Sequence, residues 1–367
     1  MSPRPPPFSD LRDLDEGEIT ALCRELGQPA FRARQVLHWL YGMRVDAVEA
    51  MKNLPAAFRA ELAKRGGIAL PRVSRAQGSA DTTRKFLLEL ADGQFIETVL
   101  IPASAGLYGD RSDRLTLCVS TQVGCAYGCR FCASGLDGFR RNLAPSEIVG
   151  QLIVAERERK CRVSNLVFMG MGEPLANYGN VLRAIRILNA PWGIGLGARK
   201  ITISTSGLAP EIEKLAAEPL QVRLAISLHG AHNEIRDRIM PVNRRHPVER
   251  LMAACEADYQ VKGRLITFEY ILLAGVNDAL AEAPLLAGLA HRAHAKVNLI
   301  PFNEVAETGF KRPSDEQCRR FAEAVSRAGA TVTLRTEKGH DIEAACGQLR
   351  LRQIRGNATV ATSRAPC

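Results

Sequence analysis

Cys125-Ala-Tyr-Gly-Cys129-Arg-Phe-Cys132 is the stretch of this 367-residue chain that indicates both its architecture and its chemistry. Its three thiols are spaced C-x3-C-x2-C, and the aromatic Phe131 precedes the last of them. A cube of four irons normally takes one thiolate per iron, so three closely spaced thiolates leave one iron open. An open iron can bind and reduce a substrate. The stretch therefore predicts a reactive 4Fe–4S cluster held by Cys125, Cys129 and Cys132.

A structural zinc site is the alternative interpretation of these cysteines. Zinc takes four ligands in such sites, and Cys118 is available as a fourth thiolate at a C-x6-C-x3-C-x2-C spacing. This spacing is not one of the usual paired zinc knuckles, and no second C-x2-C follows along the chain. The cysteines therefore favour the cluster, and zinc stays open as the alternative.

Strand-like and helix-like segments alternate from Leu115 onward. Six strand–helix units imply a parallel sheet with right-handed crossovers. The count predicts an α/β protein with a partial (β/α)6 TIM-like barrel, not a closed eight-stranded one. The expected strands are Leu115–Thr121, Ser164–Met169, Lys200–Thr205, Val222–Leu228, Leu265–Leu273 and Lys296–Pro301, with a further strand at Thr331–Arg335. The expected helices are Pro145–Arg159, Asn177–Leu188, Pro210–Ala217, Pro247–Val261, Ala279–Ala293 and Ser314–Arg327.

The chain before this alternation is organised differently. Apolar residues recur at helical spacing over Glu16–Leu26, Pro29–Gly42 and Pro55–Arg65, which predicts three helices. Strand-like alternation follows over residues 72–101, with Asp92-Gly93 as a hairpin turn. We therefore expect a helical accessory domain over residues 1–70, a β-hairpin linker over 71–105 and a catalytic barrel over 106–367.

Polar or glycine-rich segments follow the expected strands of the barrel. In barrels of this kind the loops after the strands build the active site. The first strand also has a polar face, on which Thr116, Cys118 and Ser120 alternate with apolar residues. The segments that follow the strands are Cys125–Cys132, Gly170–Pro174, Ser204–Gly207, Ser227–Gly230, Gly275–Asp278 and Pro301–Asn303.

The charge of the chain favours a polyanionic partner. Its 49 Lys and Arg residues outnumber 39 Asp and Glu residues, giving a formal net charge of +10 and a pI near 9.3. Such a balance is typical of nucleic-acid binding, although solvated surfaces also carry scattered charge. No apolar run is long enough to cross a bilayer, and the N-terminus has no apolar export signal. The ten cysteines have spacings that suit metal and redox chemistry, so we expect a cytoplasmic protein with no membrane partner.

Two further segments complete a recognisable pattern. The cluster motif, Gly170-Met-Gly-Glu-Pro174 and Asp341-Ile-Glu-Ala-Ala-Cys346-Gly-Gln-Leu349 together resemble the radical S-adenosylmethionine (SAM) adenosine methyltransferases of ribosomal and transfer RNA, the RlmN/Cfr family. The triad alone would indicate only the radical SAM superfamily, whereas its combination with Cys118 and Cys346 is specific to this family. The resemblance spans nearly the whole chain and is strongest to the dual-specificity RlmN type. It implies a partial barrel of the radical SAM type, in which the open iron chelates the methionyl part of SAM.

The resemblance also implies a reaction, the methylation of adenosine carbon 2 in 23S rRNA and in the tRNA anticodon loop. Cys346 would take a methyl group from a first SAM as a thiolate nucleophile. Cleavage of a second SAM would give a 5′-deoxyadenosyl radical that takes a hydrogen from this methyl group, and the carbon radical would add to adenine. Glu97 would accept a proton. Attack of Cys118 on the Cys346 sulfur would then release the product and leave a Cys118–Cys346 disulfide.

The remaining roles come from the same resemblance. Gly172 and Glu173 would bind the amino group of SAM, and four other residues its ribose, carboxylate or adenine: Ser204, Ser227, His229 and Asn303. Residues 1–70 would be an RNA-binding accessory domain, and an external, flavodoxin-like electron donor would supply reductant. Three alternatives stay open: methylation of carbon 8 as in the Cfr relatives, a radical SAM enzyme for a small molecule or peptide, and a zinc-stabilised RNA-binding module without catalysis.

Overall fold

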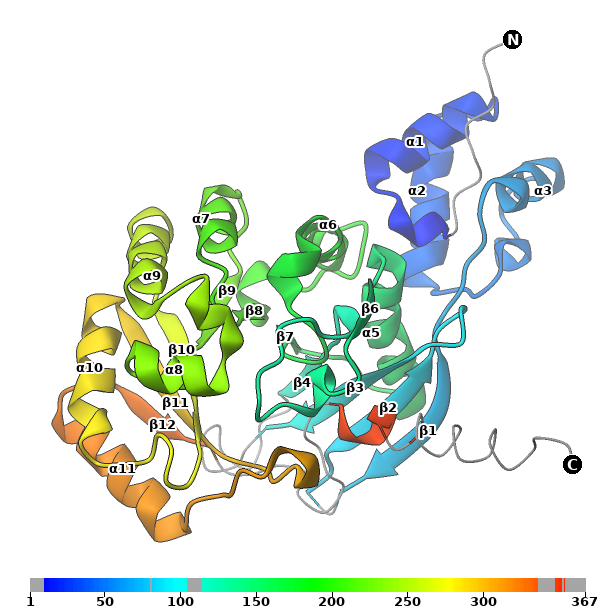
Figure 1. Ribbon diagram of the computed structural model, residues 1–367. Helices are drawn as coiled ribbons and strands as arrows, with labels where there is room; N and C mark the ends of the chain where they lie inside the picture. Colours follow the sequence, from blue (N-terminus) through cyan, green and yellow to red (C-terminus); the bar gives the residue numbers. More distant parts are fainter. Residues whose placement is uncertain (1–9, 80, 104–113, 336–346, 352, 354–367) are drawn as a thin grey trace, which may run out of the picture.

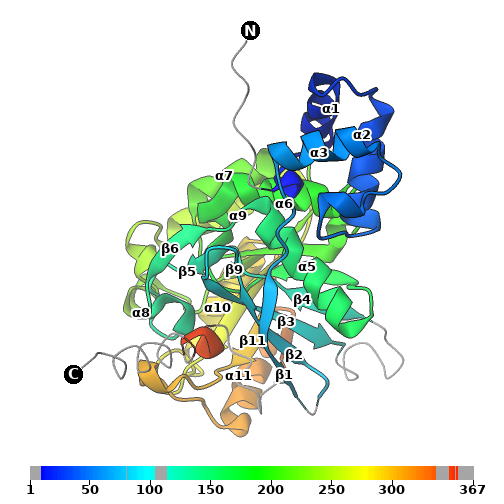
Figure 2. The ribbon, with the colours of Figure 1, turned by 90° about the vertical axis from the view of Figure 1, so that its right-hand side faces the viewer.

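The computed structural model describes residues 10–79, 81–103, 114–335, 347–351 and 353. Within these residues ten strands form one sheet, in the order β1-β2-β3-β4-β7-β8-β9-β10-β11-β12. The crossover helices lie outside the curved sheet (Figures 1 and 2). β1 and β12 are the two edges of this order, so the sheet is an open barrel.

The part of the sheet from β4 to β12 is parallel throughout. Each of these strands was expected from the sequence to within three residues at either end. The predicted partial barrel is therefore confirmed, with the further strand at its edge. The parallel strands are β4 (Leu115–Cys118), β7 (Asn165–Phe168), β8 (Ile201–Thr205), β9 (Arg223–Ser227), β10 (Ile266–Leu272), β11 (Ala295–Pro301) and β12 (Val332–Leu334).

The helices that connect these strands follow the expected sequence pattern. α5 begins at Pro145, where a fixed φ suits the first helical position and the missing N–H is not needed. No helix in the described part of the chain is long and apolar enough to cross a membrane. The helices are α5 (Pro145–Arg159), α6 (Tyr178–Asn189), α7 (Ala209–Ala217), α8 (Asn233–Ile239), α9 (Val248–Lys262), α10 (Glu282–Arg292) and α11 (Asp315–Arg327). Short helical turns are η4 (Ala133–Gly135), η5 (Pro174–Asn177), η6 (Ala198–Lys200), η7 (Pro241–Arg244) and η8 (Ala306–Thr308).

Three antiparallel strands extend the sheet before β4. They are β1 (Arg72–Gly78), β2 (Arg84–Glu89) and β3 (Phe95–Pro102), and the expected turn at Asp92-Gly93 joins the last two. β3 pairs with β4 so that Val99 lies opposite Cys118. The hairpin is therefore continuous with the sheet that carries Cys118.

The N-terminal segment is helical, as the sequence predicts. It consists of η1 (Leu11–Asp13), α1 (Glu16–Glu25), α2 (Phe31–Leu37) with its continuation η2 (His38–Gly42), η3 (Val48–Ala50) and α3 (Ala56–Arg65). These helices sit at one end of the barrel, beside α5 and α6 (Figure 2). Asp13 joins the two parts, because its carboxylate accepts from Ser146 N–H at 2.9 Å and its carbonyl accepts from Arg183 at 2.9 Å.

Candidate active site

A small ribbon separate from the main sheet carries the three-cysteine loop. β5 (Gln122–Gly124) and β6 (Phe139–Asn142) pair antiparallel, and the loop runs between them. The N–H of Cys125 donates to Gly138 O at 3.1 Å, which closes the base of the loop. Gly124 has a φ of +76°, and a Cβ there would lie 1.8 Å from the Gly138 carbonyl oxygen. Only glycine therefore allows the ribbon to close directly before the first cysteine.

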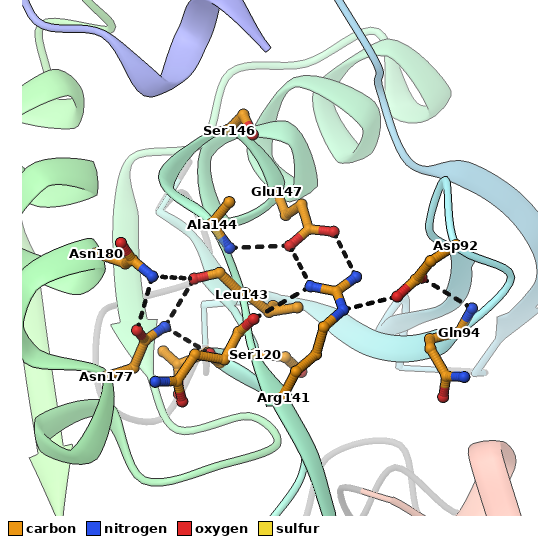
Figure 3. Close-up of polar contacts among 12 residues, drawn as sticks. Asp92, Gln94, Ser120, Arg141, Leu143, Ala144, Ser146, Glu147, Asn177 and Asn180 are labelled. Atoms are coloured by element: carbon orange, nitrogen blue, oxygen red, sulfur yellow. Dashed lines mark hydrogen bonds and ion pairs between the residues drawn. The ribbon is translucent and has the colours of Figure 1, made fainter. Parts of the chain in front are cut away.

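The ribbon is fastened to its surroundings by a polar network (Figure 3). Arg141 of β6 donates from Nε to Asp92 at 2.7 Å and from both terminal nitrogens to Glu147 at 2.7 and 2.8 Å. The hydrogen bond from Arg141 is the main cause that lowers the pKa of Asp92. On the other side, Asn177 donates to the carbonyl oxygens of Thr121 and Leu143 at 2.9 and 2.8 Å. The ribbon is thus tied to the hairpin turn, to α5 and to the segment before α6.

The loop brings the three predicted cluster ligands together. The N–H of Cys132 donates to Cys129 O at 3.0 Å, and Arg130 N–H donates to Ile239 O at 2.9 Å, which attaches the loop to α8. Cys125, Cys129 and Cys132 all line one cavity of about 320 Å³, here called the cofactor cavity.

The environment of these thiols suits a cluster. Burial raises the pKa of Cys125 to about 12 and raises that of Cys129 well above its usual value. A thiolate at these positions needs compensating positive charge, which cluster irons provide. The Ser134 hydroxyl lines the same cavity, buried and without a hydrogen-bond partner among the described residues. No three His, Cys, Asp or Glu side chains in that part of the chain converge on a single metal ion, but a cube binds each thiolate through a different iron.

Gly172 and Glu173 lie on the loop after β7 and line the cofactor cavity. A Cβ at Gly172, whose φ is +98°, would lie 2.5 Å from Gln122 Cβ, so the loop requires glycine there. The Glu173 carboxylate accepts from Ser206 N–H at 2.7 Å and from Leu175 N–H at 3.0 Å. Burial raises the pKa of Glu173. The carboxylate therefore ties the loops after β7 and β8 together at the wall of the cavity.

His229, Ser204 and Ser227 line the same cavity. The two serine hydroxyls lie 3.4 Å apart. His229 Nδ1 accepts from Ile271 N–H at 3.0 Å, so the imidazole carries its proton on Nε2. Burial, together with the charge of Arg236, lowers the pKa of His229 to about 3. The imidazole is therefore a neutral donor, packed edge-on against Phe131 with ring centroids 5.0 Å apart.

Arg236 of α8 is fully buried beneath these loops. It donates to the Ser206 and Ser227 carbonyl oxygens at 3.1 Å each, and to Asn243 Oδ1 at 2.9 Å. Burial lowers the pKa of Arg236 to about 10, and the charge of Cys129 is the largest influence that opposes this shift. The guanidinium thus fixes the ends of β8 and β9 and places positive charge near the cluster loop.

Cys118 lines a second cavity of about 270 Å³, here called the Cys118 cavity. This cavity adjoins the cofactor cavity, since six residues line both: Phe131, Cys132, Met169, Ile271, Ile300 and Arg335. Asn303 lies in the Cys118 cavity and not beside Ser204, Ser227 and His229. Cys118 thus lies in a cavity that adjoins the cofactor cavity, and one predicted cluster ligand, Cys132, lies in the wall that the two cavities share.

Glu97 lines neither cavity. Its side chain is 1% exposed and pairs with Lys85 at 2.9 Å. The carboxylate also accepts from the N–H groups of Gly347 and Arg350, at 2.8 and 2.6 Å. Cys346, the residue before Gly347, lies outside the described residues.

Some lining residues escaped the sequence analysis. Glu269 of β10 lines the cofactor cavity, accepts from Asn298 at 2.7 Å and has its pKa raised by burial. A carboxylate inside the apolar run Ile266–Leu272 was the available signal. Arg335 lines both cavities from the end of the last strand. Thr83 lines the Cys118 cavity with a buried hydroxyl that has no partner among the described residues, and nothing in its local sequence marked it.

Two family models match the chain. The radical SAM superfamily model matches residues 119–283, which include the cluster loop and most of the cofactor cavity. The model of the ribosomal RNA large subunit methyltransferase N-terminal domain matches residues 9–68, the helical segment. The barrel and its three-thiol loop thus define a radical SAM enzyme, a class that uses a 4Fe–4S cluster and SAM.

Comparison with individual proteins narrows the class. The chain is 50% identical over 348 residues to "Probable dual-specificity RNA methyltransferase RlmN" of Akkermansia muciniphila, covering 95% of this chain and 97% of the relative. It is 45% identical over 343 residues to "Dual-specificity RNA methyltransferase RlmN" of Syntrophus aciditrophicus, covering 93% and 96%. The crystal structure of a radical SAM methyltransferase from Sphaerobacter thermophilus superimposes with a TM-score of 0.86 at 43% identity, covering 93% of this chain and 99% of that one. The chain belongs to the RlmN family of radical SAM RNA methyltransferases.

Proposed function

We propose that the protein methylates carbon 2 of an adenosine in 23S rRNA and in tRNA, through a methyl group carried on Cys346. The observation that carries this proposal is the pair of adjoining cavities. One holds the three cluster thiols, and the other holds Cys118 behind a shared wall. The carrier cysteine must first react with SAM and then transfer its methyl carbon to a base. It therefore needs the cofactor cavity and the Cys118 cavity to lie close together.

The residues of the cofactor cavity would hold the cofactors. Cys125, Cys129 and Cys132 would bind the cluster, which supplies the electron that cleaves SAM to methionine and the 5′-deoxyadenosyl radical. The neutral His229 would donate from Nε2 to the bound cofactor. Glu173 would accept a hydrogen bond from the amino group of SAM. Each oxygen of its carboxylate already accepts one backbone N–H, so one of them would accept a second hydrogen bond. The remaining contacts to SAM would come from Gly172, Ser204 and Ser227 within this cavity, and from Asn303 across the shared wall.

The two cysteines outside the triad would carry the methyl group and release the product. The Cys346 thiolate would displace S-adenosylhomocysteine from one SAM, and a second SAM would supply the radical that activates the resulting methyl group. After the carbon has bonded to adenine, the proton of carbon 2 would pass to Glu97, and Cys118 sulfur would attack Cys346 sulfur. The sulfur–carbon bond would break as the disulfide forms, and the single electron spent on cleaving SAM would be recovered in this step. Two electrons from an external, flavodoxin-like donor would restore the thiols, which suits a reducing cytoplasm.

The position of Gly347 supports this arrangement. A Cβ at Gly347 would lie 2.6 Å from Ser134 N, so this residue packs directly on the cluster loop. Cys346 directly precedes Gly347 in the sequence, and consecutive Cα atoms are about 3.8 Å apart. The disulfide requires that the Cα atoms of Cys118 and Cys346 approach within about 7 Å in at least one state.

In vitro turnover tests the proposal. Protein reconstituted under anaerobic conditions is incubated with SAM, a reductant and either a 23S rRNA fragment or a tRNA, and nucleosides are identified by mass spectrometry. We expect 2-methyladenosine from both RNAs. Formation of 8-methyladenosine would place the enzyme with the Cfr relatives, and formation of 5′-deoxyadenosine without RNA methylation would overturn the assignment of an RNA substrate.

A further inference from the structure

A buried ion pair on the inner face of the sheet has no role in holding the cluster or SAM. Lys85 of β2 and Glu97 of β3 lie 2.9 Å apart, with side chains 0% and 1% exposed. Lys85 lies opposite Val99, and Val99 lies opposite Cys118, so all three side chains point to the same face. Glu97, two residues before Val99, shares this face. The ion pair thus belongs to the same surface as Cys118.

The Glu97 carboxylate connects this surface to the C-terminal segment. One oxygen accepts from Gly347 N–H at 2.8 Å and pairs with Lys85, and the other accepts from Arg350 N–H at 2.6 Å. Hydrogen bonds from N–H groups to a buried carboxylate are charge-assisted and hence stronger than neutral ones. Both oxygens of Glu97 are therefore occupied in binding the start of the helical turn that follows Gly347.

The other side of Gly347 rests on the cluster loop. Gly347 has a φ of +92°, and a Cβ there would lie 2.6 Å from Ser134 N and 2.8 Å from Ala133 C. The segment is therefore held between Glu97 and the residues that directly follow Cys132. A side chain at position 347 would push it away from both.

We propose that Glu97, with Lys85 as its counterion, is a positioning residue that fixes the segment beginning at Gly347 so that Cys346 can accept its methyl group. This inference rests on the proposed function and adds a second, earlier role to Glu97. A proton acceptor acts only after RNA has bound and the carbon from Cys346 has bonded to adenine. A positioning residue is needed before any RNA is present.

Methyl loading of Cys346 without RNA separates these roles. Wild-type protein and Glu97→Gln are reconstituted with cluster and incubated with SAM and reductant, and the tryptic peptide containing Cys346 is weighed by mass spectrometry. We expect methylated peptide in the wild type and at least about tenfold less in Glu97→Gln, the factor that corresponds to 1.4 kcal/mol. Cluster absorbance should stay within about twofold of wild type, because neither Glu97 nor Lys85 lines the cofactor cavity.

Three further variants distinguish a loss of positioning from a general loss of folding. Lys85→Met/Glu97→Gln removes both buried charges, so no unpaired charge remains, and it should lose loading as well. Gly347→Ala leaves the ion pair untouched and should reduce loading through the clash with Ser134. The matched control is Glu156→Gln, which alters a buried carboxylate that pairs with Arg44 and accepts from Val163 N–H at 2.6 Å, away from both cavities. It should load normally.

The outcomes are distinct. Normal loading in Glu97→Gln, with a later block in which RNA stays attached to the protein, would overturn the positioning role and leave only a proton acceptor. Equal loss in Glu156→Gln would also overturn it, since loading would then follow general stability. Absence of methyl on Cys346 in the wild type would overturn the proposed function itself, and the inference with it.

Discussion

The cofactor cavity and the Cys118 cavity share a wall but differ in chemistry. The polar residues that line the cofactor cavity include Glu173, Glu269, His229, four serines (Ser134, Ser204, Ser206 and Ser227) and the three predicted cluster ligands. The Cys118 cavity is lined mainly by apolar side chains, with Cys118, Thr83 and Asn303 among its few polar residues. The cofactor cavity suits a charged cofactor with several polar groups. The Cys118 cavity suits a planar base or a methylated sulfur. Under the proposed function, the radical would form in the cofactor cavity and would be used in the Cys118 cavity.

Loss of one cluster ligand should have the largest effect. In Cys129→Ala we expect the iron content to fall. Both 5′-deoxyadenosine formation and RNA methylation should drop by at least about a thousandfold, because every later step of the proposed reaction depends on the cluster. Iron analysis and nucleoside mass spectrometry measure this. Cys161→Ala is the control, since this half-exposed cysteine lies outside both cavities and should behave as wild type. Retained turnover in Cys129→Ala would contradict the assigned ligand.

Loss of Cys118 should affect only the second cavity. In Cys118→Ala we expect the first equivalent of 5′-deoxyadenosine to form at a rate within about threefold of wild type, while release of methylated RNA falls by at least about a hundredfold. Without the attacking sulfur, RNA should stay covalently bound to protein, which a denaturing gel detects. Free methylated RNA at the normal rate would show that the two cavities are not divided in this way.

His229 makes the cofactor cavity sensitive to acid. Its pKa is about 3 in the folded protein and about 6.5 when unfolded, so below pH 6.5 the unfolded state binds a proton that the folded state does not. Its contribution to the free energy of unfolding should therefore fall as pH decreases from about 6.5 toward 3, by up to about 1.4 kcal/mol per pH unit. In chemical denaturation, His229→Gln should lose less stability than wild type between pH 6.5 and 5. Parallel curves would mean that the imidazole is not held neutral.

The polar network of Figure 3 should give the smallest effect. The side chains of Asp92 and Arg141 are 43% and 34% exposed, so their ion pair is partly screened by water. Asp92→Asn should lower the free energy of unfolding by less than about 1 kcal/mol and leave turnover within about twofold. A melting curve and the turnover assay check both. A large loss of iron would show that this side of the ribbon controls the cluster loop.

The sequence predicted the barrel well because strand and helix periodicities are local. The parallel strands and their crossover helices were found within a few residues. α8 was missed because its seven residues, Asn233–Ile239, are too few to show an apolar period. The small ribbon was missed for the same reason, since β5 and β6 are short and lie beside the cysteines.

The positions of the candidate residues in the fold could be predicted where these residues follow a strand, and less so where tertiary contacts decide. Gly172, Glu173 and His229 come directly after strands and do line the cofactor cavity. Asn303 follows a strand too, but it lies in the other cavity, because the sequence gives no measure of how the last loop turns. The contacts of Glu97 with residues 250 or more positions later cannot be read from local pattern at all.

The pairing of β3 with β4 has a consequence for how this family can vary. Side chains alternate between the two faces of a sheet, so a shift of one residue would turn Cys118 away from its cavity and Glu97 away from Gly347. An insertion or deletion within either strand would therefore abolish the reaction while leaving every motif intact in the sequence. Among homologous genes, the numbers of residues in β3 and in β4 should therefore each stay fixed, and length differences should fall outside these two strands.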